Sequence, residues 1–242
     1  MEKPRAVNSS LVDTVKKWRR GFDDNSRLIR LSDFACHAMS LAEAIVGHEE
    51  ALAKASDMAI SCKKGCGACC RQVIPISPPE AFLLSERIIN ARTSEGSILE
   101  ERFHESLERL KTNGMEEAPL IDQAGKYFQL GLPCPFLEEE SCSIHLHRPL
   151  TCREQLVVSP ADFCGEFPSY GIEPLSIPLS IQEAFGEVAG ELLGMGRIMI
   201  PMIRLQAWVE AHREVGEKVW ETGFLADKLV ERVFTRIPHI KK

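Results

Sequence analysis

Eight of the nine cysteines in this 242-residue chain fall into two groups. The first group is Cys62, Cys66, Cys69 and Cys70, and the second is Cys134, Cys142, Cys152 and Cys164. Thiolates are soft ligands that suit zinc and iron–sulfur clusters, and both kinds of centre usually take four protein ligands. We therefore expect the chain to bring all eight thiols onto one metal centre or onto two neighbouring ones.

The first group lies within nine residues. Cys62, Cys66 and Cys69 are close enough for one loop to wrap around a single centre, and glycines on both sides of Cys66 suit a tight turn. Cys69 and Cys70 are adjacent, and the side chains of neighbouring residues diverge. Cys70 is therefore expected to serve a second metal, a larger cluster, or a redox role.

The second group is spread out, with seven, nine and eleven residues between successive cysteines. A zinc ribbon usually offers a second close Cys-x-x-Cys pair, which this group lacks. Single ligands that are widely spaced in sequence suit a cluster of iron and sulfide better than one zinc ion, so the spacing favours an iron–sulfur cluster, most simply 4Fe-4S, over zinc. A disulfide or unmetallated thiols form the third alternative.

Other side chains near the cysteines could support such a site. Two histidines, His145 and His147, would lie on one side of an extended segment, which allows a mixed Cys/His site, although packing beside the site is the favoured interpretation. Cations that could neutralise a thiolate centre are close in sequence, and they are Lys63, Lys64, Arg71, Arg148 and Arg153.

Composition limits the possible partners. The net charge of −6 argues against nucleic acid and against an anionic membrane surface. The start of the sequence has no secretory signal pattern, and no apolar run approaches the length of a membrane span. An odd number of cysteines fits reduced thiols, so a cytoplasmic location is expected, with an unknown protein or redox partner.

The periodicity of apolar residues predicts a mainly α fold with few short strands and an irregular cysteine-rich region. We expect an N-terminal helical segment over 1–60, a metal-binding domain over 61–165, and C-terminal helices over 166–242. The predicted helices cover about 26–52, 77–92, 98–111, 180–193, 201–219 and 225–237, with one weak strand at 127–130. Cys36, in the first of these helices, is interpreted as a buried packing residue.

Short motifs link this chain to a known family. Cys-Gly-Ala-Cys-Cys at 66–70, Cys-Pro-Phe-Leu at 134–137, Cys-Ser-Ile at 142–144 and His-Arg-Pro-Leu-Thr-Cys-Arg at 147–153 resemble the CxxCxxCC cysteine-cluster family, also called the YkgJ-type zinc- or iron-chelating domain. The resemblance covers about residues 60–165. The first gap, between Cys62 and Cys66, has three residues where the family name has two. Cys164 is included from spacing alone.

The resemblance implies metal binding, and it also suggests one possible enzymatic function. Flagellin lysine N-methylases look related through the same domain, which suggests a methyltransferase that uses S-adenosylmethionine as an alternative function. A third hypothesis is a thiol or metal sensor in which Cys69 and Cys70 react on oxidation. The leading hypothesis is a metal- or cluster-binding protein with a structural or redox role. The remaining sequence offers no persuasive catalytic group.

Overall fold

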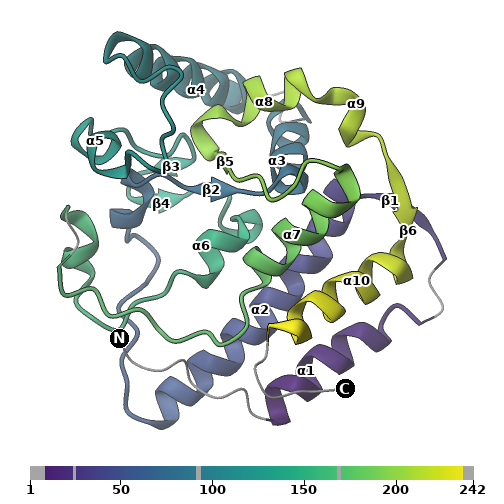
Figure 1. Cartoon of the computed structure of the whole chain (residues 1–242). Helices are drawn as coiled ribbons and strands as arrows, with labels where there is room; N and C mark the ends of the chain where they lie inside the picture. The colour runs from purple at the N-terminus through teal and green to yellow at the C-terminus, as the bar shows by residue number, and fades with distance from the viewer. Residues whose placement is uncertain (1–8, 24–25, 91–93, 168–169, 237–242) are drawn as a thin grey trace.

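The computed structural model of the chain describes residues 9–23, 26–90, 94–167 and 170–236 (Figure 1). Helices dominate this part of the chain, and its strands form three short antiparallel pairs. The mainly α prediction is confirmed.

The α-helices are α1 Ser9–Arg20, α2 Leu31–Ala55, α3 Pro78–Asn90, α4 Ser94–Thr112, α5 Ala124–Gln129, α6 Leu150–Glu154, α7 Ile181–Leu193, α8 Leu205–Ala211, α9 Arg213–Gly216 and α10 Thr222–Thr235. Short 3₁₀ helices are η1 Ala68–Arg71, η2 His145–His147, η3 Ala161–Gly165 and η4 Met202–Arg204. Strand β1 Leu28–Arg30 pairs with β6 Val219–Glu221, β2 Pro75–Ile76 with β5 Ile200–Pro201, and β3 Leu137–Glu138 with β4 Ser141–Cys142.

One large apolar core joins helices from both ends of the chain. Helix α2 buries Phe34, Leu41 and Ile45 on one face, because apolar residues recur along it at three- and four-residue steps. Helices α1, α7 and α10 pack around this face and lie together in Figure 1. The hairpin of β3 and β4 lies on the opposite side of the molecule from α1 and α10.

The long helix α2 begins later than the sequence pattern predicts. Arg30 ends strand β1, and its backbone N–H donates to Asp33 in the first turn of the helix. Residues 28–30 are instead held in a strand by pairing with 219–221 near the other end of the chain. Helix α7 begins as predicted, because Ser180 Oγ accepts a hydrogen bond from Glu183 N over 3.1 Å.

Two predicted elements are wrong. The proposed strand at 127–130 is helix α5 and its end, in which Tyr127 is buried. The helix proposed over 201–219 is divided into β5, η4, α8, α9 and β6. Pro201 pairs with Pro75 in a strand rather than starting a helix. Both elements depend on partners distant in sequence, which local periodicity does not report.

The interpretation of Cys36 as a packing residue is also wrong, because its side chain is exposed on α2. The apolar stripe of this helix passes on either side of it, through Ala35 and Ala38.

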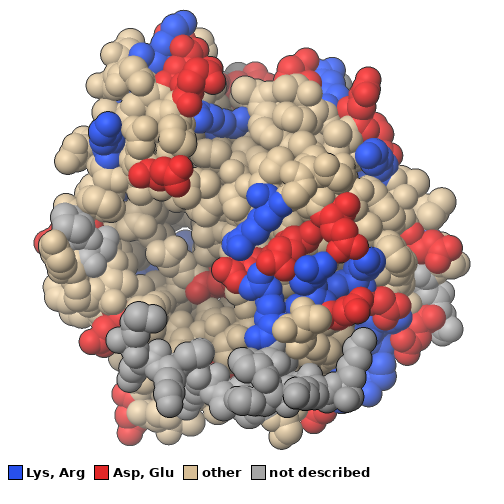
Figure 2. Space-filling model, viewed as in Figure 1, with Lys and Arg blue, Asp and Glu red and all other residues tan. Residues whose placement is uncertain are grey.

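The surface over α7 and α10 carries a dense set of ion pairs, seen as mixed blue and red in Figure 2. Arg232 pairs with Glu187 and Glu191, and Arg236 pairs with Glu183 and Glu187. Within the described residues, no helix has both the length and the apolar character needed to cross a bilayer.

Candidate metal centre

The loop of the first cysteine group is anchored at its start and turned sharply in its middle. Ser61 N donates to Val157 O over 3.0 Å, and Cys66 N donates to Lys63 O over 3.1 Å. Gly65 has a φ of 87°, a conformation that favours glycine, so the predicted tight turn forms there. The chain then enters η1, which carries both Cys69 and Cys70.

Gly67 lets this loop approach the β3–β4 hairpin closely. A Cβ atom at this position would lie 2.5 Å from Glu140 Oε2 and 2.8 Å from Leu137 Cδ1. The glycine is therefore required by the contact between the first cysteine loop and the hairpin that carries Cys142.

The two cysteine groups meet in space, as the sequence predicts. Cys134 N donates to Cys70 O over 2.6 Å, which joins the groups through the backbone. Strand pairing sets Cys142 opposite Leu137, three residues beyond Cys134. Helix η3, which contains Cys164, packs against η1, and Gln72 Nε2 donates to Cys164 O over 3.2 Å.

A buried carboxylate on α3 anchors the start of α6, the helix that carries Cys152. Glu80 is fully buried, and its Oε1 accepts from Leu150 N over 2.7 Å at the start of α6. Its Oε2 accepts from Ser77 N and Ser77 Oγ at 2.8 and 2.6 Å. Burial raises the pKa of Glu80. The sequence shows Glu80 only as a helix-start residue, so its second role at α6 comes from the tertiary structure.

Burial keeps most of these thiols protonated in the absence of a ligand. It raises the pKa of Cys134 to about 12, and it also raises the pKa of Cys142 and Cys152. Cys69 differs, because the thiol of Cys70 donates a hydrogen bond to it and lowers its pKa to about 7. The same hydrogen bond raises the pKa of Cys70.

Cys69 is a neighbour of both groups. After burial, the main influences that raise the pKa of Cys164 are the nearby Cys69, Cys62 and Cys66. Burial is also the largest cause of the raised pKa of Cys152, and the nearby thiols of Cys134, Cys69 and Cys142 raise it further. A nearby like charge disfavours a thiolate, so these influences identify which sulfurs lie near one another.

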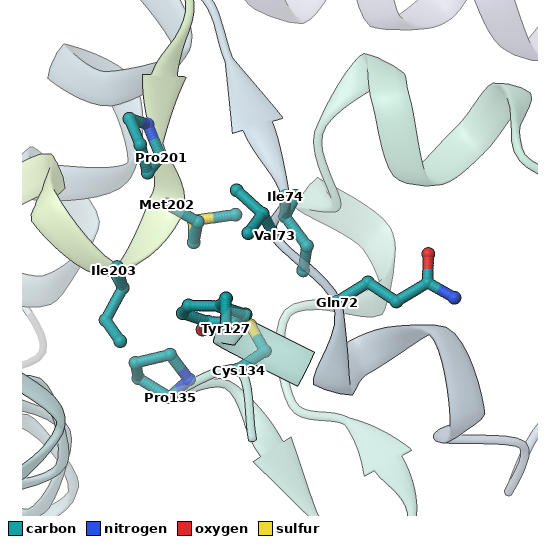
Figure 3. Close-up of a pocket in the computed structure, with 9 residues that line it drawn as sticks. All are labelled: Gln72, Val73, Ile74, Tyr127, Cys134, Pro135, Pro201, Met202 and Ile203. Carbon is teal, nitrogen blue, oxygen red and sulfur yellow. The ribbon is translucent and has the colours of Figure 1, made fainter. Parts of the chain in front are cut away.

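Part of the site is enclosed by apolar side chains. Cys134 is buried among Ile74, Ile76 and Phe136, with Cys70 and Cys152 packed against them. Figure 3 shows the small cavity next to Cys134, whose walls include Tyr127, Ile74 and Met202. The cavity measures about 10 Å³, which is room for one water molecule at most.

The cations near the cysteines differ in their partners. Arg71 pairs with Glu140 at 2.5 Å, and Arg153 pairs with Glu43 at 2.8 Å. Lys63 and Lys64 are exposed. Among the described residues, Arg148 has no carboxylate partner, and its buried Nε atom has no hydrogen-bond acceptor.

The charge of Arg148 adds to the lowering of the pKa of Cys69 and opposes the rise in the pKa of Cys62 and Cys142, so its guanidinium lies near thiols of both groups. A set of four thiolates around a metal carries net negative charge. Such a centre would supply the anionic partner that this guanidinium lacks among the described residues. The donor set and this unpaired cation therefore fit an anionic metal–thiolate centre.

The two histidines are not arranged as a pair of ligands. His145 and His147 lie in η2, where residues two apart point in different directions, and not in the extended segment that the sequence suggested. The side chain of His145 is largely exposed. Partial loss of solvent is the main cause that lowers the pKa of both rings, and the charges of nearby arginines lower it further.

Among the described residues, no three His, Cys, Asp or Glu side chains stand close enough to hold one metal ion in their present positions. Four thiolates on zinc, at Zn–S distances of about 2.3 Å, would have their sulfurs about 3.8 Å apart. No three of the gathered thiols therefore have this mutual spacing as they stand.

Residues 61–169 match the CxxCxxCC family, which is described as a "Putative zinc- or iron-chelating domain". The match supports metal binding by this part of the chain. Comparison with curated proteins and with solved structures gave no match.

Proposed function

We propose that this protein binds an iron–sulfur centre through its two cysteine groups, with a structural or electron-carrying role. The observation that carries the proposal is the convergence of both groups at η1, through the Cys134 N to Cys70 O hydrogen bond and the packing of η3 on η1. The half-buried Arg148 lies next to them and has no carboxylate partner among the described residues. Eight gathered thiols exceed what one zinc ion uses, since structural zinc takes four ligands.

Two further features favour iron and sulfide over zinc. No three of the gathered thiols have the mutual spacing of a single ion as they stand, whereas the inorganic sulfide of a cluster separates its ligands further. The apolar residues around Cys134 limit access of water, which is one of the factors that set the reduction potential of a cluster. Zinc remains the alternative metal.

A thiol sensor is the second candidate, and one observation favours it. The lowered pKa of Cys69 and its hydrogen bond from Cys70 would give a reactive thiolate with a neighbouring thiol to form a disulfide. The two functions are compatible if loss of the metal exposes this pair.

The S-adenosylmethionine alternative receives less support from the described residues. An open hollow of about 550 Å³ lies beside Cys142, and its walls include Arg102, Glu138, Glu139 and Ser141. A nucleoside site usually offers apolar and aromatic walls, and this hollow is mainly polar. We therefore do not propose a methyltransferase.

The test is chemical analysis of protein purified without oxygen. The proposal predicts a brown protein that contains iron and acid-labile sulfide in similar amounts. A colourless protein with stoichiometric zinc and no sulfide would replace iron–sulfur with zinc. A protein without bound metal, after expression with both metals supplied, would refute the proposed function.

A further inference from the structure

The adjacent cysteines on η1 point toward different surroundings. A 3₁₀ helix has three residues per turn, so the Cα–Cβ bonds of Cys69 and Cys70 leave the helix about 120° apart, although the Cys70 thiol turns back to donate a hydrogen bond to Cys69. Two neighbouring ligands on such a helix are poorly placed to bind one small centre together, but they can each serve one of two adjacent centres.

Cys70 belongs with three cysteines of the downstream group. Its carbonyl accepts from Cys134 N, and its side chain packs with those of Cys134 and Cys152 against the apolar cluster of Ile74 and Phe136. Cys142 joins this set through the β3–β4 pairing and is a neighbour of Cys152. We call Cys70, Cys134, Cys142 and Cys152 the inner set.

The other four cysteines are linked by a different set of contacts. Cys62 packs against Leu156 and Leu175, in an apolar cluster separate from that of the inner set. Cys164 is brought to η1 by η3 and by the hydrogen bond from Gln72. The neighbours of its thiol are Cys69, Cys62 and Cys66. We call Cys62, Cys66, Cys69 and Cys164 the outer set.

Arg148 lies near thiols of both sets, because its charge acts on Cys62 and Cys69 of the outer set and on Cys142 of the inner set. A single cation in this position can stabilise two anionic centres at once. It also reduces the repulsion that two neighbouring centres of like charge would otherwise suffer.

We infer that the protein holds two neighbouring iron–sulfur centres, each with four thiolate ligands. The outer set binds one centre, the inner set binds the other, and the peptide between Cys69 and Cys70 joins them. Each set supplies the four cysteines that a 4Fe-4S cluster takes. This inference rests on the proposed function and adds to it the number of centres and the ligands of each.

The first measurement uses the unaltered protein. Two 4Fe-4S centres predict about eight iron atoms and eight sulfides per chain. Two reduced centres this close should also couple magnetically, giving a broadened electron paramagnetic resonance spectrum after reduction with dithionite. About four iron atoms per chain with a simple, uncoupled spectrum would overturn the inference and leave the proposed function intact.

The second measurement assigns ligands with matched variants. Cys66→Ser should remove the outer centre only, and Cys152→Ser the inner centre only, so each should halve the iron and sulfide content and abolish the coupling. The double variant should lose all the iron. Cys36→Ser is the control, because Cys36 is exposed and belongs to neither set, and it should change nothing.

Other outcomes refute the division. Complete loss of iron in each single variant, with the helical circular dichroism signal retained, would indicate one shared centre. Loss of both centres in Cys69→Ser alone would indicate that Cys69 bridges them. If Cys152→Ser does not fold, Cys70→Ser tests the inner set in the same way. Absence of iron and sulfide from the unaltered protein would instead refute the proposed function.

Discussion

At the scale of single residues, Arg148 distinguishes this site from an ordinary set of buried thiols. Its side chain is half-buried, and leaving its buried Nε atom without an acceptor is costly, so its position is explained best by a negative group that binds there. Its two neighbours in the cationic set, Arg71 and Arg153, already have carboxylate partners. The charge of the bound centre would complete the environment of Arg148.

Replacing Arg148 by Met should lower the reduction potential of the bound centre, because a positive charge near the cluster favours the added electron. A charge-assisted hydrogen bond worth about 1.5–3 kcal/mol corresponds to roughly 60–130 mV for a one-electron couple. Redox titration followed by optical absorbance measures the shift. Arg148→Lys should recover part of it.

The control for this prediction is Lys64→Met, which removes one positive charge from an exposed position in the first cysteine loop. Solvent screens an exposed charge, so its effect on the potential should be much smaller. Equal shifts in both variants would mean that only net charge matters and that Arg148 has no special position.

Cys69 should be the most reactive of the eight clustered thiols when metal is removed. Its pKa of about 7 means that about half of it is thiolate at neutral pH, whereas Cys134, with a pKa of about 12, stays protonated. The rate of alkylation of Cys69 by iodoacetamide, followed by peptide mass spectrometry, should rise with pH and reach half its maximum near pH 7.

Cys70→Ala removes the hydrogen bond that lowers this pKa, so the midpoint for Cys69 should move upward, toward the usual value of about 8.5. The exposed Cys36 provides an internal control, and its rate should be the same in both proteins. An unchanged midpoint in Cys70→Ala would show that the hydrogen bond is not the cause.

At the scale of elements, Glu80 connects the starts of two helices and places Cys152. Glu80→Ala would leave the buried N–H groups of Ser77 and Leu150 without an acceptor. Each such group costs about 1–3 kcal/mol, so we expect a loss of roughly 3 kcal/mol in the free energy of unfolding. Urea denaturation measures this loss, and metal analysis should show reduced occupancy.

Glu86→Ala is the matched control on the same helix. Glu86 pairs with Arg30 at 2.5 Å in a partly exposed ion pair, which should contribute less than about 1 kcal/mol. A loss of the same size in both variants would mean that the buried hydrogen bonds of Glu80 have no particular importance.

Two helical glycines should respond in opposite ways to alanine. Gly47 on α2 has open space where a Cβ would be added, so Gly47→Ala should raise the free energy of unfolding by up to about 1 kcal/mol. At Gly190 on α7, the added Cβ would lie 2.1 Å from the backbone oxygen of Gly196, so Gly190→Ala should destabilise the protein. Thermal denaturation compares the two, and stabilisation by Gly190→Ala would contradict the close packing of α7.

At the scale of the whole molecule, the large helical core and the cysteine site are built from different sets of residues. The core formed by α1, α2, α7 and α10 has no buried cysteine, whereas the second cluster includes Cys134. The helical core should therefore fold without metal. The three expected segments, 1–60, 61–165 and 166–242, remain a prediction, although the first and third share this core.

Removal of metal should loosen the cysteine segment but leave the helices folded, because binding of ligands by thiolates contributes to folding free energy. The sequence places the whole of 134–164 in the metal-dependent part. However, Leu150 is buried in the helical core and Leu156 under α2, which should keep α6 in place. We therefore expect the loss of order to be concentrated in residues 137–148.

A glutamyl endopeptidase tests this prediction by cleaving after Glu138, Glu139 or Glu140 in the hairpin. Cleavage should be much faster after chelation, while far-ultraviolet circular dichroism keeps most of its helical signal. Equal cleavage with and without metal would mean that the hairpin is not stabilised by the centre. Loss of the helical signal would mean that the core depends on the metal as well.

The amino-acid sequence alone determined the chemistry of the site and the general class of the fold. Cysteine is the residue type that binds soft metals, and its spacing predicted two groups that would meet. Three- and four-residue periodicity predicted α2 and α7, because their buried faces are continuous in sequence. These features depend on residue type and on local spacing, so they can be read without knowing the fold.

Only the tertiary structure decided which cysteines are neighbours, which arginine lacks a carboxylate partner among the described residues, and where short strands form. The contact between Cys70 and Cys134, the surroundings of Arg148 and the role of Glu80 at α6 each depend on residues distant in sequence. The same is true of β1 with β6 and of the broken segment after Pro201. Local sequence favoured helices in these places, and long-range pairing and packing outweighed that preference.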